Sequence, residues 1–385
     1  MKDFKKIEDQ YGLNLFQKRE IALIRGQNAR VWDETGKEYI DCTSGHGVAS
    51  IGHANKKIVE ALTSQAAQII TCTGSFYNEQ RAALMEKLVS ISPKNLNRVF
   101  LCNSGTESIE AALKFARIST AKTDFICAMR SFHGRTMGAL SATYSPKYRD
   151  DFKPLVPGFH FVPFNNFKQL KEKANEKTAG ILLEIVQGEG GVYPADAFYL
   201  KQVAQLCREK NIILIIDEVQ TGFARTGKLF ACNHFGLEPD ILCLSKAIAG
   251  GFPLGAVLCA PSIDVPLGKH GTTFGGNPLG CAAALAAIEF ILENDLAAEA
   301  EKKGQYFIEK MTKQKLDRVR EIRQIGLMIG IELKEKGQAY INRLQEEGIL
   351  VLPAGASVIR LLPPLTIGYE ELDIVIDTLI KVLSA

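Results

Sequence analysis

The sequence has little of what marks membrane, secreted and nucleic-acid-binding proteins. No apolar run in its 385 residues approaches the roughly 20 residues needed to span a bilayer, and the N-terminal MKDFKKIEDQYG has no apolar signal core. Its 46 Lys and Arg and 43 Asp and Glu are interspersed without a block of either sign, for a net charge of +3. These absences argue against nucleic acid or a membrane as the main partner and predict a cytoplasmic protein.

Paired cysteines are also missing. The nine cysteines stand singly, without a C-x-x-C pair, and most lie in apolar runs such as ILCLS and AVLCA, so we expect buried thiols rather than disulfides. His46 and His53, in GHGVASIGH, resemble a metal pair, but the adjoining glycines favour a loop near a ligand. We therefore predict no metal site.

The central part of the chain alternates short apolar runs with helix-like segments such as 107–118 and 196–210. The runs are continuous rather than alternating, which is typical of strands covered on both faces. This pattern predicts an α/β fold with an open, mainly parallel sheet. The seven candidate strands are 98–102, 125–129, 159–163, 180–186, 212–217, 241–245 and 254–260.

After Pro278 the sequence pattern changes and predicts an α+β arrangement for the C-terminal part of the chain. Helices are expected at 279–293, 297–316 and 338–347, and strands at 326–333, 349–353 and 358–363. The pattern of residues 31–42 predicts a hairpin, which we expect to pack with this C-terminal part. We predict a large domain over 51–275 and a small domain built from residues 1–50 and 276–385.

The segment IILIIDEVQTGFARTGK, 212–228, first suggests a nucleotide hydrolase, with Asp217 on a metal and a phosphate loop ending at Lys228. That interpretation fails on order, because the phosphate loop of such enzymes precedes the acidic strand. It also fails at Leu229, where the hydroxyl that binds Mg²⁺ is absent. The loop holding Arg225 and Lys228 is expected near a subunit interface, with no role assigned to either residue. No G-x-G-x-x-G follows any strand, which argues against a dinucleotide fold.

Lys246 follows an apolar strand and precedes a glycine-rich turn, in LSKAIAGGFP. A desolvated lysine has a lowered pKa and becomes an amine nucleophile, although most strand-end lysines simply face solvent. Asp217, at the end of another buried strand, suits a pyridine ring that must stay protonated to accept electrons. The two residues together predict a pyridoxal phosphate site.

Such a cofactor also requires a phosphate-binding loop. Asn103-Ser-Gly105-Thr106-Glu107 opens the helix expected at 107–118, and N–H groups at a helix N-terminus bind phosphate. An ordinary Ser/Thr helix cap is the alternative interpretation of this motif.

Six motifs in collinear order then resemble one family. From about residue 20 onward the chain is similar to the class III pyridoxal-phosphate aminotransferases, a fold type I family. Within that class it resembles acetylornithine aminotransferases and those lysine and ornithine aminotransferases whose substrate is attached to a small acidic amino-group carrier protein. The motifs are NSGTE, FHGRT, QGEGG, IIDEVQTGFARTGK, LSKAIAGGFPLGA and HGTTFGGNPL.

The resemblance implies roles for the cofactor-binding residues. Lys246 would attach the cofactor covalently and later move a proton, Asp217 would pair with the pyridine nitrogen, and Gln220 would approach the ring hydroxyl. These roles suit a reaction in which a protonated pyridine stabilises a developing carbanion.

The same resemblance places further residues around the ring. Phe132 and Val219 would press on its two faces, although core packing alone could also explain them. Gly105 and Thr106 would bind the phosphate, joined by Thr273 from the second subunit of a homodimer.

For the substrate, the resemblance implies that Arg135 and Arg360 bind carboxylates, since a guanidinium meets a carboxylate in bidentate fashion. Glu189 would pair with Arg360 while an ω-amine reacts, and the α-carboxylate of glutamate would displace it. A purely structural Glu189–Arg360 salt bridge is the alternative.

We therefore expect an aminotransferase acting between a protected ornithine- or lysine-type donor and 2-oxoglutarate, in arginine or lysine biosynthesis. The carrier protein is an expected partner. The alternatives are another class III enzyme, such as a 4-aminobutyrate or ornithine aminotransferase or an aminomutase, or a nucleotide-binding ATPase or catalytically inactive binding protein.

Overall fold

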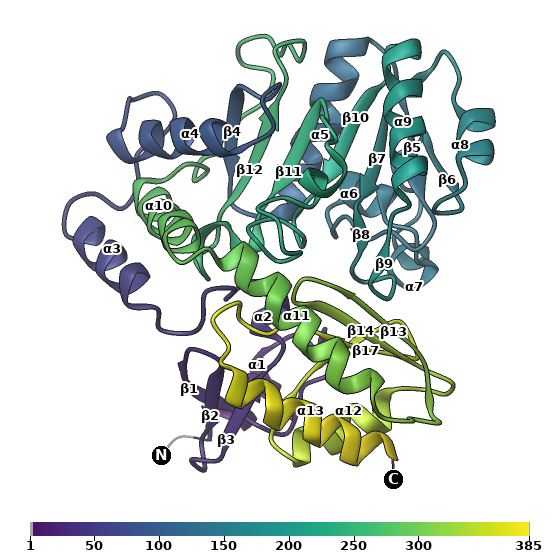
Figure 1. The fold of residues 1–385 in the computed structure, drawn as a ribbon. Coiled ribbons are helices and arrows are strands. Elements are labelled where there is room, and N and C mark those ends of the chain that lie inside the picture. Colours follow the sequence, from purple (N-terminus) through teal and green to yellow (C-terminus); the bar gives the residue numbers. More distant parts are fainter. Residues whose placement is uncertain (1–2, 385) are drawn as a thin grey trace.

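The computed structural model describes residues 3–384 and forms two lobes (Figure 1). The larger lobe surrounds a seven-stranded sheet, and the smaller one combines purple N-terminal strands with yellow-green C-terminal elements. We use the term small lobe for strands β1–β3 together with the elements from β13 to α13. Within the described residues, no helix is long and apolar enough to cross a membrane.

The large sheet has the strand order β4-β12-β11-β10-β7-β5-β6. Only β12 is antiparallel to its neighbours β11 and β4, which confirms the mainly parallel α/β prediction. All seven candidate strands are present. Their bounds are Arg98–Cys102 (β4), Asp124–Ala128 (β5), Phe159–Val162 (β6), Thr178–Glu184 (β7), Ile213–Asp217 (β10), Ile241–Leu244 (β11) and Gly255–Cys259 (β12).

Hydrophobic residues cover both faces of this sheet, which explains why its strands are continuously apolar. Along β10, Ile213 and Ile215 pack in one cluster with helix α5 (Gly105–Thr120). Leu214 and Ile216 point to the opposite cluster, which includes residues of α9 (Ala197–Lys210) and α4 (Glu79–Ile91). Successive side chains of a strand point to opposite faces, so an apolar run serves two helix layers.

The two ends of the chain meet in the small lobe. Strands β1 (Leu23–Gln27), β2 (Arg30–Asp33) and β3 (Glu38–Asp41) form a sheet with β15 (Ile349–Leu350), which pairs in parallel with β3. The predicted hairpin is β2–β3. A second sheet has the order β13-β14-β17-β16, comprising Val319–Ile325 (β13), Met328–Leu333 (β14), Val358–Leu361 (β17) and Leu352–Ala354 (β16).

Several boundaries in the C-terminal part differ from the sequence-based ones. Helix α11 (Leu296–Thr312) ends four residues before the predicted 316, and strand β13 had no predicted counterpart. The terminal helix α13 (Tyr369–Ser384) was also not anticipated, whereas α10 (Pro278–Glu293) and α12 (Gln338–Glu346) were. The strand missed, VREIRQI, has pairs of adjacent polar residues between apolar residues at every third position, so it lacks the alternating pattern of a half-buried strand.

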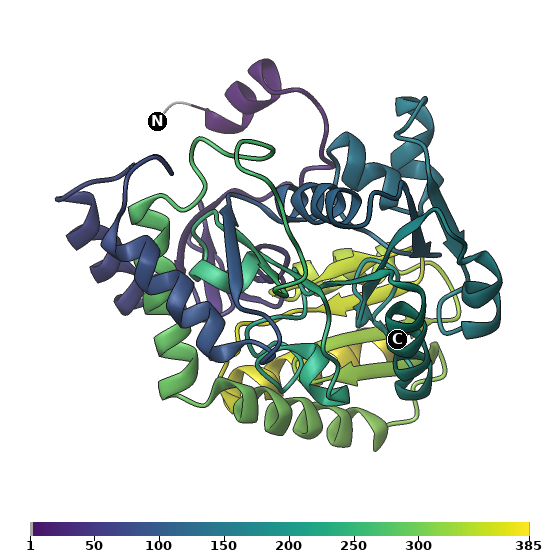
Figure 2. The same ribbon diagram turned by 90° about the horizontal axis from the view of Figure 1, so that it is seen from above.

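The remaining helices are short or peripheral. Seen from above, α1 extends away from the body of the chain (Figure 2). None of its residues is buried. These elements are α1 (Phe4–Tyr11), α2 (Ser44–Gly47), α3 (Lys56–Ala66), α6 (Met137–Ala142), α7 (Pro146–Arg149) and α8 (Phe167–Lys173).

Candidate active site

Polar residues gather at one edge of the large sheet. Glu184 ends β7, Asp217 ends β10, and Lys246 comes two residues after β11. These three strands are parallel, so their carboxyl ends open at the same edge. In open α/β sheets, ligands bind outside this edge.

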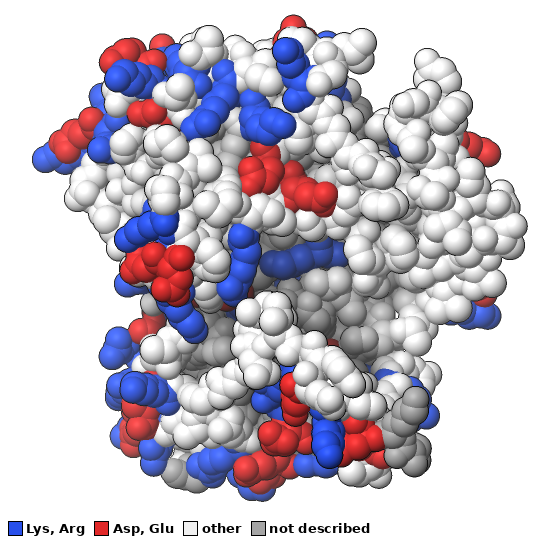
Figure 3. Space-filling model, turned by 180° about the vertical axis from the view of Figure 1, so that it is seen from behind, with Lys and Arg blue, Asp and Glu red and all other residues white. Residues whose placement is uncertain are grey.

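A cavity of about 260 Å³ lies there. Nine of the residues predicted from the sequence line it: Gly105, Thr106, Phe132, Arg135, Glu189, Asp217, Val219, Gln220 and Lys246. The back of the molecule is also hollowed near its middle, with Lys and Arg side chains in the hollow (Figure 3).

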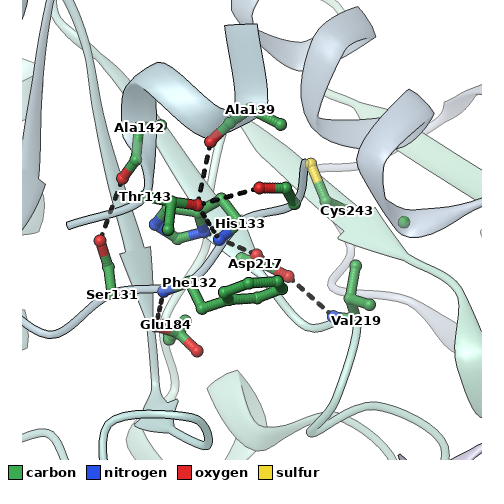
Figure 4. Close-up of polar contacts among 12 residues, drawn as sticks. Ser131, Phe132, His133, Ala139, Ala142, Thr143, Glu184, Asp217, Val219 and Cys243 are labelled. Carbon is green, nitrogen blue, oxygen red and sulfur yellow. Dashed lines mark hydrogen bonds and ion pairs between the residues drawn. The ribbon is translucent and has the colours of Figure 1, made fainter. Parts of the chain in front are cut away.

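Asp217 is held from two sides at the bottom of this cavity (Figure 4). Its Oδ2 lies 2.7 Å from Nδ1 of His133, and its Oδ1 accepts a hydrogen bond from the backbone N–H of Val219 at 3.0 Å. A carboxylate only accepts, so His133 is the donor of this pair. The sequence analysis did not select His133, although its position beside Phe132 in FHGRT was a signal.

Glu184 is a second buried carboxyl in the cavity, and the sequence analysis did not select it. It pairs with Asp217 in the register of the adjacent strands and accepts a hydrogen bond from the backbone N–H of Phe132 at 3.2 Å. Burial, with the nearby Asp217 charge, raises the pKa of Glu184 well above its ordinary value. A single acidic residue within the apolar run GILLEIV was the available signal.

We expect Glu184→Gln to stabilise the protein increasingly as pH rises. In the wild type the folded state keeps a proton that the unfolded chain loses above a pH of about 4.5, so stability falls as pH rises toward the folded-state pKa. Gln cannot lose a proton but still accepts from Phe132. The melting temperature of the variant relative to wild type should therefore increase as pH rises above about 4.5, by on the order of 2 °C for each kcal/mol of destabilisation that the substitution removes. Calorimetry of the cofactor-free protein measures this; a difference independent of pH would contradict it.

Lys246 combines desolvation with backbone strain. Burial lowers the pKa of its amine, outweighing the opposing charge of Glu189. Its φ of 45° lies in the left-handed region, which costs a non-glycine residue about 1–3 kcal/mol and is concentrated at functional sites. A desolvated amine with a lowered pKa gives up its proton more readily, which suits a nucleophile and base.

The N-terminus of α5 forms a cradle that fits a phosphate group. A Cβ on Gly105 would lie 2.7 Å from Val219 Cγ1, so only glycine fits there. The Thr106 hydroxyl is 2.8 Å from that of Thr136, and Ser104 caps the helix by accepting from Glu107 N–H. The free N–H groups of a helix N-terminus and nearby hydroxyls are the donors a phosphate needs. The chain therefore fits pyridoxal phosphate at both ends, with the cradle for its phosphate and Asp217 for its ring nitrogen.

Glu189 and Arg360 form an ion pair above the cavity. Arg360 Nη2 donates to Glu189 Oε1 at 2.6 Å, and Nη1 donates to Gln220 Oε1 at 3.1 Å. Burial opposes ionisation of Glu189, but Arg360 outweighs it and holds the pKa of that carboxyl below its usual range. The Arg360 side chain is fully buried, whereas that of Glu189 is 28% exposed, so Glu189 is the partner that solvent and ligands can reach.

Two of the predicted residues, Arg135 and Thr273, are exposed. Arg135 is exposed at the cavity, with its guanidinium 4.4 Å from the centre of the Tyr148 ring and 5.9 Å from that of Phe132. Thr273 is exposed and does not line the cavity of its own chain. The partner-subunit role of Thr273 stays a prediction.

The two histidines that resembled a metal pair, His46 and His53, have different surroundings. His53 Nε2 lies 2.7 Å from Asp41 Oδ2, whereas the pKa of His46 is lowered by burial and by Arg360, which places it within electrostatic range of the ion pair. Between residues 3 and 384, no group of three or more His, Cys, Asp or Glu residues could hold a metal ion.

Arg225 and its loop are buried within the chain. Arg225 is 1% exposed, and its Nη1 donates to the carbonyls of Leu327 and Pro363 at 3.0 and 2.6 Å. The glycine-rich loop therefore ties the segment after Asp217 to the small lobe, while Lys228 is exposed. The loop that resembled a phosphate site packs against protein.

This fold, with a buried Asp and a desolvated Lys facing a phosphate cradle, defines a pyridoxal-phosphate-dependent aminotransferase. The model of the family Aminotransferase class-III matches residues 16–383, and the chain belongs to that family. It is 44% identical over 382 residues to the [LysW]-aminoadipate semialdehyde transaminase of Deinococcus radiodurans, covering 98% of this chain and 89% of that protein. It is also 44% identical over 388 residues to the acetylornithine aminotransferase of Methanocaldococcus jannaschii, covering 98% and 97%.

Solved structures agree with this assignment. The ornithine aminotransferase of Toxoplasma gondii superposes with a TM-score of 0.94 at 33% identity, covering 99% of this chain and 94% of that one. The acetylornithine aminotransferase of Elizabethkingia anophelis superposes with a TM-score of 0.86 at 34% identity, covering 99% and 98%. The fold type I prediction is thereby confirmed.

Proposed function

We propose that this enzyme moves the terminal amino group between a protected ornithine- or lysine-type substrate and 2-oxoglutarate, in arginine or lysine biosynthesis. The protected substrate is N-acetylornithine, or lysine or ornithine linked to a carrier protein. Relatives named [LysW]-aminoadipate semialdehyde transaminase and acetylornithine aminotransferase support both options.

The observation that carries this proposal is the Glu189–Arg360 pair above Lys246. An enzyme of this kind must accept an ω-amine in one half-reaction and the α-amine of glutamate in the other. When no α-carboxylate is present, Glu189 neutralises Arg360. The α-carboxylate of glutamate displaces Glu189 and forms a bidentate pair with Arg360. Arg135 then binds the distal carboxylate of glutamate, or the remote carboxylate of the ω-amine donor.

Pyridoxal phosphate, when bound, supplies a ring that accepts the electron pair left when a proton leaves the amine-bearing carbon. Asp217, fixed by His133 and Val219, holds the proton of the ring nitrogen. With the cofactor bound, Lys246 would be its covalent attachment point, and its amine would carry the proton between the two carbons. Burial lowers the pKa of this amine, which favours the neutral form that can accept a proton.

The other residues hold the ring in place. Gly105 and Thr106 would bind the phosphate, Phe132 and Val219 would cover the two ring faces, and Gln220 would lie near the ring hydroxyl; all five residues line the cavity. Thr273 of a second copy completes the phosphate site in a homodimer.

The cellular setting belongs to the same proposal. It includes a cytoplasmic location and an acidic carrier protein as partner. We also propose the division of the chain into a large domain (51–275) and a small domain (1–50 and 276–385). The net charge of +3 suits an acidic partner.

Turnover on two donors tests the proposed function. The purified protein should be yellow, glutamate should shift its absorption band, and kcat/KM should be highest for either N-acetylornithine or carrier-linked lysine. We expect at least a tenfold preference over free ornithine and 4-aminobutyrate, because binding energy from the remote part of a substrate raises kcat/KM. A protein that uses neither protected donor would refute the proposal.

A second candidate is ornithine aminotransferase, favoured by the TM-score of 0.94 to the Toxoplasma gondii enzyme. A 4-aminobutyrate aminotransferase remains the other class III alternative. A preference for either unprotected amine in the same assay would select between these two.

A further inference from the structure

Glu189 lies at the tip of a small hairpin. Strands β8 (Val186–Gln187) and β9 (Tyr193–Pro194) pair, and residues 188–192 connect them. The backbone N–H of Val192 donates to Gln187 O at 2.9 Å, which closes the base of this loop. We call residues 188–192 the Glu189 loop.

The small lobe presents one row of residues to this loop. Arg323 on β13 pairs with Gly330 on β14, and Gly330 pairs with Arg360 on β17. Residues directly opposite one another in antiparallel strands project from the same face, so Arg323 and Arg360 point the same way with a glycine between them. A Cβ on Gly330 would lie 2.9 Å from Val192 Cβ and 3.2 Å from Gly191 O. The Glu189 loop therefore rests in the gap between the two arginines.

The two arginines hold the two ends of the loop. Arg360 binds Glu189 at the tip, and Arg323 Nε donates to Gly191 O at 3.0 Å. The Arg323 guanidinium also lies 3.9 Å from the centre of the Tyr193 ring, and its Nη1 donates to Glu332 Oε2 at 2.6 Å. Tyr193 in turn donates its hydroxyl to Glu332 at 2.8 Å. The Arg323 side chain is only 6% exposed, and its Nε and Nη1 are both hydrogen-bonded, whereas its buried Nη2 has no partner. Arg323 is therefore a buried anchor for the base of the loop.

We propose that Arg323 is a positioning residue that sets how readily Glu189 releases Arg360. The inference rests on the proposed function, in which the pair stays closed for an ω-amine and opens for glutamate. Only the tip of the loop has to move for that exchange, while Arg323 keeps its base in place. Without this anchor the loop loses its fixed starting position, and the equilibrium between closed and open pairs shifts toward open.

Single-turnover kinetics of Arg323→Met in the holoenzyme test this. For the ω-amine, we expect the ratio of the single-turnover rate constant to the dissociation constant to fall about tenfold. This is the size expected for losing one charge-assisted hydrogen bond. Glutamate should instead bind about threefold more tightly, because less work is needed to displace Glu189. Glu189→Gln, which removes the ion pair itself, should likewise lower the reactivity of the ω-amine and tighten the binding of glutamate. Arg323→Lys should restore part of the wild-type preference for the ω-amine relative to glutamate.

Arg320→Met is the matched control. Arg320 lies on the same strand and also binds Glu332, at 3.1 Å, but its side chain is 60% exposed and it has no contact with the Glu189 loop. This variant should keep the wild-type preference for the ω-amine relative to glutamate. An Arg323→Met enzyme in which both half-reactions fall equally, or neither changes, would overturn the inference. A wild type that accepts glutamate but no ω-amine would refute the proposed function instead, and the glutamate affinity of Arg323→Met would still decide the role of Arg323.

Discussion

Replacing Lys246 with Ala should abolish transamination, with kcat reduced at least about 10⁴-fold. The variant loses the covalent attachment point and the base, and proton transfer by a positioned side chain alone contributes roughly 10²–10⁴-fold. The phosphate cradle at Gly105 and Thr106 remains, so the variant should still bind the cofactor. Turnover and the absorption spectrum measured on the same preparation separate the two effects.

Lys228→Ala supplies the control for this experiment. Lys228 is exposed at the end of the glycine-rich loop and is not among the residues that line the cavity in the described part of the chain. Its removal should change kcat less than about twofold, as expected for a surface substitution away from the site. Substantial turnover by Lys246→Ala would disprove the assigned role of Lys246.

The second large effect is expected for Asp217→Asn, with kcat reduced by about 10²–10³-fold. Asn has the same shape, its Oδ1 can accept from Val219 N–H, and its amide can donate to the other tautomer of His133. What the variant loses is the negative charge facing the ring nitrogen, and removing one preorganised electrostatic contact has an effect of this size. Single-turnover rates with glutamate, followed by absorbance, provide the measurement.

The shape-conserving substitution makes this experiment specific to charge. We expect the melting temperature and the cofactor stoichiometry of Asp217→Asn to stay close to those of wild type. Its half-reactions with the two substrates should slow by similar factors, since both need a protonated ring. A variant with wild-type rates would show that the ring nitrogen needs no anionic partner.

Much of the large sheet was predictable because its information is local. Each strand is a short apolar run bounded by polar residues, and burial on both faces makes that run continuous. The same holds for Asp217, Lys246 and Gly105, each of which ends such a run or follows it within three residues. The resemblance of their motifs to one family then indicated how they are combined. Strand β13 and the end of α11 were predicted poorly, because their half-exposed patterns carry a weaker periodic signal.

The sequence by itself determined the residues that carry the chemistry, since a nucleophilic lysine, an acidic ring partner and a helix N-terminus are encoded over a few residues each. The tertiary structure alone decided which distant residues meet. Glu189 and Arg360 are 171 residues apart, and His133 and Asp217 are 84 apart. The raised pKa of Glu184 and the row of Arg323, Gly330 and Arg360 also exist only after folding, because desolvation and strand register depend on neighbours that no local segment specifies.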